Sequence, residues 1–149
     1  MDRIDRVSIV GMGAMGILYG DFFANALGRE QVTFLADSDR ARRYRNTPVY
    51  CNGRKMDFRI QDGAVPDSQG PAQLLLFAVK ATALGDAISV AGNQVGKDTV
   101  ILSVLNGITS EAVIGEALGM DHVLYCVSQG MDAVKLGNEL TYSHMGQIC

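Results

Sequence analysis

A glycine-rich turn directly after a short apolar run is the feature that most limits how this chain can fold. Residues 7–10 (Val-Ser-Ile-Val) have the pattern of a buried strand, and a helical pattern begins at Ala14. The glycine turn joins these two elements and includes the first residues of the helix. It consists of Gly11, Met12, Gly13, Ala14, Met15 and Gly16. In such a turn the first glycine permits a sharp bend, the second lets a diphosphate approach the main chain, and the third allows close packing of the helix on the sheet. The free N–H groups of the helix's first turn favour an anion, so the pattern predicts a dinucleotide site.

A second strand and an acidic residue extend this pattern. Residues 31–36 predict a strand, and Asp37 follows it, 21 residues after Gly16. An acid at this place normally receives the 2′-hydroxyl of the adenosine ribose. A basic cluster comes next, which suits either a nucleotide phosphate or a solvated helix face; it consists of Arg40, Arg42, Arg43 and Arg45.

The rest of the chain alternates strand and helix patterns. An Asn-Gly pair at 52–53, flanked by the apolar runs 49–51 and 56–60, predicts a β-hairpin in place of one crossover helix. The other predicted strands span 74–79, 99–105 and 123–127, the other helices span 39–45, 81–91 and 109–118, and a further strand or hairpin spans 139–148. We therefore expect one α/β domain over residues 1–149, with a doubly wound, mostly parallel sheet and its ligand cleft at the carboxyl ends of the strands.

Charge and apolar patterning narrow the classes of partner. A net charge of −3 gives no reason to expect a nucleic-acid partner, since such a binding face needs clustered Lys and Arg. The longest apolar run, 74–79, is far shorter than a membrane span, and the first six residues lack the pattern of a signal peptide. The three cysteines share no metal-ligand spacing, so we expect free thiols, no metal site and a cytoplasmic protein.

Two polar residues follow predicted buried strands, at the edge where such sheets bind ligands. Lys80 can offer a positive charge to a carboxylate or phosphate, and Asn106 can donate and accept hydrogen bonds toward a ribose or amide. Taken singly, the commoner explanations are a solvated lysine and an ordinary Asn-Gly turn.

Their sequence context resembles a known family. The glycine turn, the segment 77–82 (Phe-Ala-Val-Lys-Ala-Thr) and the segment 105–108 (Leu-Asn-Gly-Ile) followed by Glu111 resemble the N-terminal domain of ketopantoate reductase, as do the hairpin at 51–53 and the segment 143–146 (Ser-His-Met-Gly). The resemblance implies reduction of ketopantoate, a 2-keto acid, to pantoate by NADPH, in the biosynthesis of pantothenate and coenzyme A. It also implies that Lys80 and Asn106 face the nicotinamide and substrate, and that the glycine turn holds the diphosphate.

The chain departs from the family pattern in two places. The family often has an arginine after the second strand that pairs with the 2′-phosphate of NADP, whereas this chain has Asp37, which suits NAD. Arg40 can still reach a phosphate, so we expect NADP with NAD as the alternative. The family also continues into a helical domain that carries a general-acid lysine, whereas this chain ends at Cys149. We expect a cofactor-binding part that is inactive without such a domain and that can form a homodimer.

Two other functions fit parts of the sequence. The cofactor domain of another two-domain hydroxy acid dehydrogenase, such as the 3-hydroxyisobutyrate dehydrogenase group, also has a Gly-x-Gly-x-Met-Gly turn but does not predict Lys80. A stand-alone nucleotide-sensing domain, like the regulatory domains of potassium transport systems, fits the length and Asp37 but leaves Lys80 and Asn106 unexplained.

Overall fold

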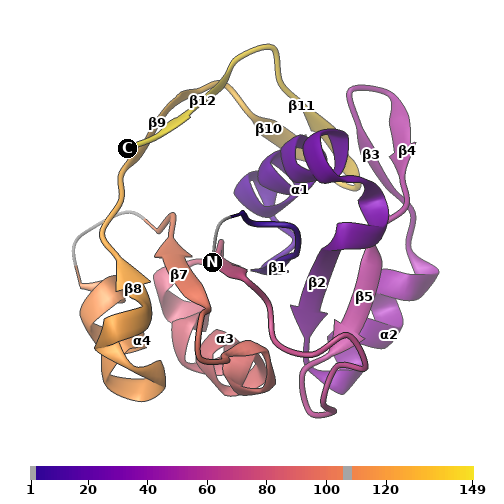
Figure 1. Cartoon of the computed structure of the whole chain (residues 1–149). Coiled ribbons are helices and arrows are strands. Elements are labelled where there is room, and N and C mark those ends of the chain that lie inside the picture. Colours follow the sequence, from indigo (N-terminus) through magenta and orange to yellow (C-terminus); the bar gives the residue numbers. More distant parts are fainter. Residues whose placement is uncertain (1–2, 106–108) are drawn as a thin grey trace.

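A six-stranded parallel sheet forms the centre of the molecule (Figure 1). A computed structural model describes residues 3–105 and 109–149. The sheet has the order β5-β2-β1-β6-β7-β8, and all five pairings are parallel. Its strands are β1 (Val7–Val10), β2 (Val32–Ala36), β5 (Arg59–Asp62), β6 (Leu74–Phe77), β7 (Val100–Ser103) and β8 (Val123–Leu124). Because β2 and β6 flank β1 on opposite sides, the strand order reverses there, as in the predicted doubly wound fold.

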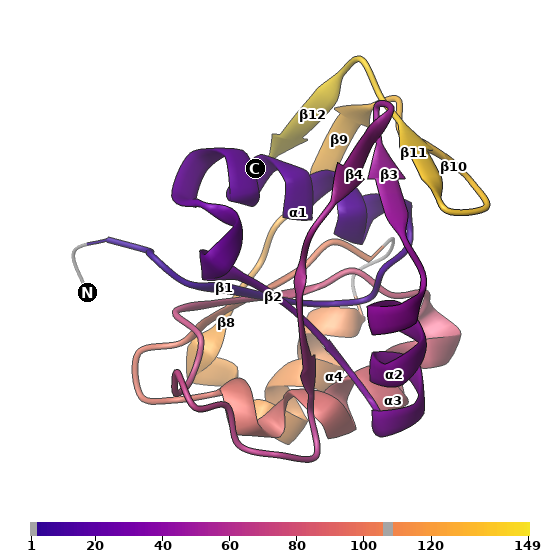
Figure 2. The same cartoon turned by 90° about the vertical axis from the view of Figure 1, so that its right-hand side faces the viewer.

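Helices cover both faces of this sheet (Figure 2). Helix α1 (Ala14–Leu27) lies on one face, and α3 (Leu84–Ala91) and α4 (Ser110–Leu118) lie on the other. Helix α2 (Ser38–Asn46) packs beside β2 and β5 at the edge of the sheet. The described residues also form four short 3-10 helices: η1 (Arg29–Gln31), η2 (Ala81–Ala83), η3 (Gly92–Gln94) and η4 (Met120–His122). Among the helices of the described residues, none combines the length and apolarity needed to cross a membrane.

Alternation along the strands divides the core into two clusters. Ile9 and Phe34 are fully buried on the α1 side, and Leu75 and Ile101 are fully buried on the side of α3 and α4. Strands covered on both faces bury successive residues, which explains the almost uninterrupted apolar runs of the sequence. The sheet is therefore a rigid base whose carboxyl edge is held between two packed layers.

A smaller four-stranded sheet lies on the outer side of α1, with the order β10-β11-β3-β4. Its strands are β3 (Val49–Cys51), β4 (Arg54–Met56), β10 (Val134–Leu136) and β11 (Glu139–Thr141). The predicted hairpin joins β3 to β4, and its turn residues Asn52 and Gly53 have φ values of 50° and 80°, as a type I′ turn requires. Strand β11 pairs in parallel with β3, so the C-terminal part of the chain returns to the hairpin. A separate two-stranded sheet contains β9 (Ser128–Met131) and β12 (Met145–Ile148).

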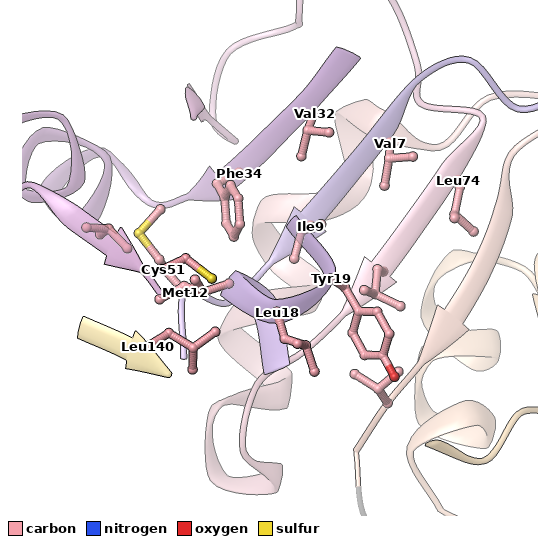
Figure 3. Packing of buried hydrophobic residues seen from close by; sticks show 14 residues of the cluster. Val7, Ile9, Met12, Leu18, Tyr19, Val32, Phe34, Cys51, Leu74 and Leu140 are labelled. Carbon is pink, nitrogen blue, oxygen red and sulfur yellow. The ribbon is translucent and has the colours of Figure 1, made fainter. Parts of the chain in front are cut away.

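Apolar and ionic contacts fasten the smaller sheet to α1. Leu18 of α1 lies in one buried cluster with Cys51 and Leu140 of the smaller sheet (Figure 3). Asp21 of α1 is fully buried and accepts hydrogen bonds from the Tyr142 hydroxyl at 2.7 Å and from Arg54 at 3.2 Å. Burial and the Asp21 carboxylate raise the pKa of Tyr142 to about 12. The smaller sheet and the main sheet therefore enclose α1 from opposite sides.

The structure corrects several expectations from the sequence. The run 56–60 is not the second arm of the hairpin, because β4 ends at Met56 and residues from Arg59 onward join the main sheet beside β2. The hairpin consequently follows α2 and does not replace a helix. Strand β8 ends at Leu124, whereas the sequence predicts a strand to 127, and β9 and β10 form in a stretch for which the sequence predicts no element.

Candidate cofactor-binding site

A cavity of about 820 Å³ opens at the carboxyl ends of β1, β2, β6 and β7. Its size falls within the range of small-molecule sites, and it spans the point where the strand order reverses. Its wall contains most of the residues singled out from the sequence, namely Gly11, Met12, Gly13, Ala14, Met15, Asp37, Arg40 and Lys80. Gly16 is not on the wall, and Asn106 lies outside the described residues.

Each glycine of the turn is required, or allows space for a ligand, for a different steric reason. Gly11 has a φ of 109°, and a Cβ there would lie 2.3 Å from the Ala78 carbonyl oxygen. A Cβ on Gly16 would lie 1.9 Å from the Gly11 carbonyl oxygen and 3.6 Å from Cε1 of Phe34. A Cβ on Gly13 would meet no atom within 4 Å. Gly11 and Gly16 therefore shape the turn, whereas Gly13 keeps the cavity beside it open.

The electrostatic environment at the start of α1 favours binding of an anion. Gly13 is the N-cap residue and provides no side-chain hydrogen bond, and the first turn contains no acidic residue. Met12, Gly13, Ala14 and Met15 all line the cavity. The backbone N–H groups and the positive end of the helix dipole consequently face the cavity without a side-chain anion to neutralise them.

Asp37 and Arg40 sit together at the end of β2. One carboxylate oxygen of Asp37 accepts the backbone N–H of Arg40 at 2.8 Å and so caps α2, and the other lies 3.1 Å from the Arg40 guanidinium. In the sequence analysis Asp37 indicates NAD, whereas Arg40 indicates NADP. The structure joins them in one ion pair on the cavity wall, with both side chains a little under half exposed.

Lys80 follows β6 and is exposed on the opposite part of the wall, where Val104 and Leu105 follow β7. Within the described ranges no salt bridge involves Lys80. Two charged wall residues are not predicted by the sequence motifs: Asp86, in the first turn of α3, and Lys135, in β10. Asp86 could have been found from its place shortly after Lys80. Lys135 could not, because long-range pairing of β10 with β11 and of β11 with β3 brings it here.

Comparison with known proteins provides a family assignment and several related folds. Residues 7–148 match the family model for ketopantoate reductase PanE/ApbA. A 2-dehydropantoate 2-reductase structure from Geobacter metallireducens superposes with a TM-score of 0.73 at 23% identity, over 96% of this chain and 48% of that one.

Two further solved structures share the fold. A ternary structure of D-mandelate dehydrogenase with NADH and anilino(oxo)acetate has a TM-score of 0.76 at 19% identity, over 96% of this chain and 47% of that one. A dimeric ketopantoate reductase from Staphylococcus aureus has a TM-score of 0.66 at 18% identity, over 92% and 44% of the two chains. The present chain thus spans about half the length of the structures it resembles.

Proposed function

The chain belongs to the ketopantoate reductase family, and from this premise we propose that it is the dinucleotide-binding domain of an NADP-dependent oxidoreductase that reduces ketopantoate to pantoate for pantothenate and coenzyme A biosynthesis. One observation carries the proposal: the glycine turn, Asp37 with Arg40, and Lys80 all line a single cavity at the carboxyl edge of the sheet. We assign residues 1–149 to this one domain, with a small 2-keto acid as its substrate partner and the cytoplasm as its compartment.

The cavity fits an extended dinucleotide in three parts. Asp37 and Arg40 would hold the adenosine ribose beyond β2, and the glycine turn with the first N–H groups of α1 would hold the diphosphate beyond β1. Lys80 and Leu105 would border the nicotinamide beyond β6 and β7. The uncapped start of α1 and the open space beside Gly13 support this fit, because both would be occupied by phosphate oxygens.

When bound, the nicotinamide supplies the hydride that reduces the ketone carbon. The Lys80 ammonium would attract the substrate carboxylate and stabilise negative charge that develops on the ketone oxygen. Asn106 would provide amide hydrogen bonds at the same end. The oxygen also needs a proton from a group within hydrogen-bond reach, and we assign that proton to the helical domain implied by the family resemblance. On this proposal Lys80 and Asn106 are catalytic residues that touch the substrate without supplying the proton, and the isolated chain is inactive.

The Asp37–Arg40 pair offers two ways to receive the adenosine ribose. The carboxylate can accept the 2′-hydroxyl of NAD, and the guanidinium can turn from the carboxylate to a 2′-phosphate of NADP. Family membership favours NADP. A second candidate function follows from Asp37 and from the related fold of D-mandelate dehydrogenase solved with NADH: an NAD-dependent dehydrogenase of another 2-hydroxy acid. The dimeric relative from Staphylococcus aureus supports a homodimer.

Mapping of backbone amide shifts during titration tests the proposal. With NADPH, the largest shifts should fall on the glycine turn, Arg40 and Ala81, and the amide of Gly53 in the distant hairpin should stay unchanged. Subsequent addition of ketopantoate should shift amides near Lys80, and a larger response to phenylglyoxylate with NADH would favour the second candidate. Shifts confined to other surfaces would contradict the assignment of the site.

A further inference from the structure

Lys135 reaches the cavity from the smaller sheet, although it is far in sequence from the other wall residues. We propose that Lys135, reaching from the smaller sheet, clamps the diphosphate of the bound dinucleotide at the start of α1. This inference rests on the proposed function and adds a ligand-binding residue to it. It makes the C-terminal β10–β11 hairpin part of the cofactor site.

Strand register places the Lys135 side chain on the inner face of the smaller sheet. Lys135 lies directly opposite Leu140 in the antiparallel pairing of β10 and β11, and residues paired in this way share one face. Leu140 is fully buried in the cluster that contains Leu18 of α1. All three residues of β10 are exposed, so the face of Lys135 is assigned from this pairing and from its place on the cavity wall. In Figure 2 the β10–β11 hairpin extends over the end of the sheet at which α1 begins.

The charges on the wall make an anion the fitting ligand. Asp37 and Arg40 neutralise each other, and Asp86 offsets one of the two wall lysines, Lys80 and Lys135. The wall therefore keeps one net positive charge, and the first turn of α1 contains no acid. No salt bridge within the described part of the chain involves Lys135. An anion at the glycine turn would therefore meet backbone N–H groups from α1 and an ammonium from β10. Both kinds of donor are typical of diphosphate sites.

An inward-facing lysine on an edge strand also has a purely structural explanation. Strand β10 is the edge of its sheet, and charged residues there discourage pairing with another chain. This explanation predicts that replacing Lys135 changes association of the protein and leaves nucleotide affinity intact. The two explanations are thus separable by binding measurements.

The test compares Lys135→Met with Lys55→Met in the 149-residue chain. Lys55 is an exposed lysine of β4 at the opposite edge of the same sheet, and it lines a separate groove. NADH and ADP-ribose, which share the diphosphate, are titrated into each variant by calorimetry. Lys135→Met should raise the Kd for both ligands about fivefold, as expected for one partly exposed ionic contact. Lys55→Met should leave both unchanged, and Lys135→Arg should restore affinity.

Each alternative outcome has a distinct meaning. Unchanged affinity in Lys135→Met, with NADH bound normally by the unmodified chain, overturns the clamp and leaves the proposed function standing. Weaker NADH binding with unchanged ADP-ribose binding also overturns it, because Lys135 would then act beyond the diphosphate. Failure of the unmodified chain to bind these two ligands and also NADPH overturns the proposed function itself. Equal melting temperatures of the variants show that any loss of affinity does not come from unfolding.

Discussion

Replacing Gly16 by alanine should destabilise the domain, although alanine is normally the better helix residue. The new Cβ would lie 1.9 Å from the Gly11 carbonyl oxygen and 2.9 Å from its carbonyl carbon, so backbone atoms would have to move. Overpacking of this kind costs about 1–3 kcal/mol, and the gain in helix propensity returns about 0.5–1 kcal/mol. The expected net loss is about 0.5–2 kcal/mol, which corresponds to a melting temperature about 1–8 °C lower for a domain of this size.

Gly85 is the matched control for this substitution. It lies in α3, is exposed, and a Cβ there would meet no atom within 4 Å. Gly85→Ala should therefore stabilise the protein by about 0.5–1 kcal/mol. Both variants are compared with the unmodified chain by thermal and urea unfolding. If Gly16→Ala melted as high as Gly85→Ala, the close contact between α1 and the glycine turn would be refuted.

Three further substitutions test other parts of the structure. Asp37→Asn keeps a residue able to cap α2 but removes the charge, so the ratio of NADPH to NADH affinity should rise; an unchanged ratio in parallel titrations would contradict a role for the carboxylate in cofactor choice. Tyr142→Phe removes a hydrogen bond to the buried Asp21 carboxylate and should cost about 1.5–3 kcal/mol in urea unfolding, whereas a change within error would show that this contact does not hold the smaller sheet. Hydrogen bonds from Arg59 lower the pKa of Asp67 from 3.8 to about 2, so the contribution of this pair is complete above about pH 4 and is lost as the pH falls toward 2. Asp67→Asn should flatten stability over that interval, and an acid unfolding curve parallel to that of the unmodified chain would contradict the assignment.

Local sequence signals were sufficient for the glycine turn and for every strand of the main sheet except β5. The strand before Gly11 is buried on both faces, and the turn residues are chosen by sterics that act within a few residues. The turn of the hairpin was equally predictable, because Asn52 and Gly53 both have positive φ, whereas its second arm was placed wrongly. Family membership and the doubly wound fold, both predicted from such motifs, are confirmed.

Features that depend on distant contacts could not be predicted. The run 56–60 has one alternating pattern, yet only its last two residues join the main sheet, where β5 pairs with β2. Strand β10 has no clear alternation and is positioned by β11, which is itself placed by β3. The ion pair between Asp37 and Arg40 depends on side-chain placement at the start of α2. The roles of Lys80 and Asn106 stay predictions.

Calorimetric titration of the unmodified chain and of Gly13→Ala with NADPH and NADH tests the central claim most directly. Gly13 has a φ of −85°, which alanine can adopt, and a Cβ there would meet open space beside the cavity. The substitution should therefore leave the melting temperature unchanged while the added methyl group obstructs the diphosphate. We predict one bound dinucleotide per unmodified chain and a Kd at least about tenfold higher in Gly13→Ala, equivalent to about 1.4 kcal/mol. Equal affinities in the two proteins, or no binding of either dinucleotide by the unmodified chain, would contradict a dinucleotide site at the glycine turn.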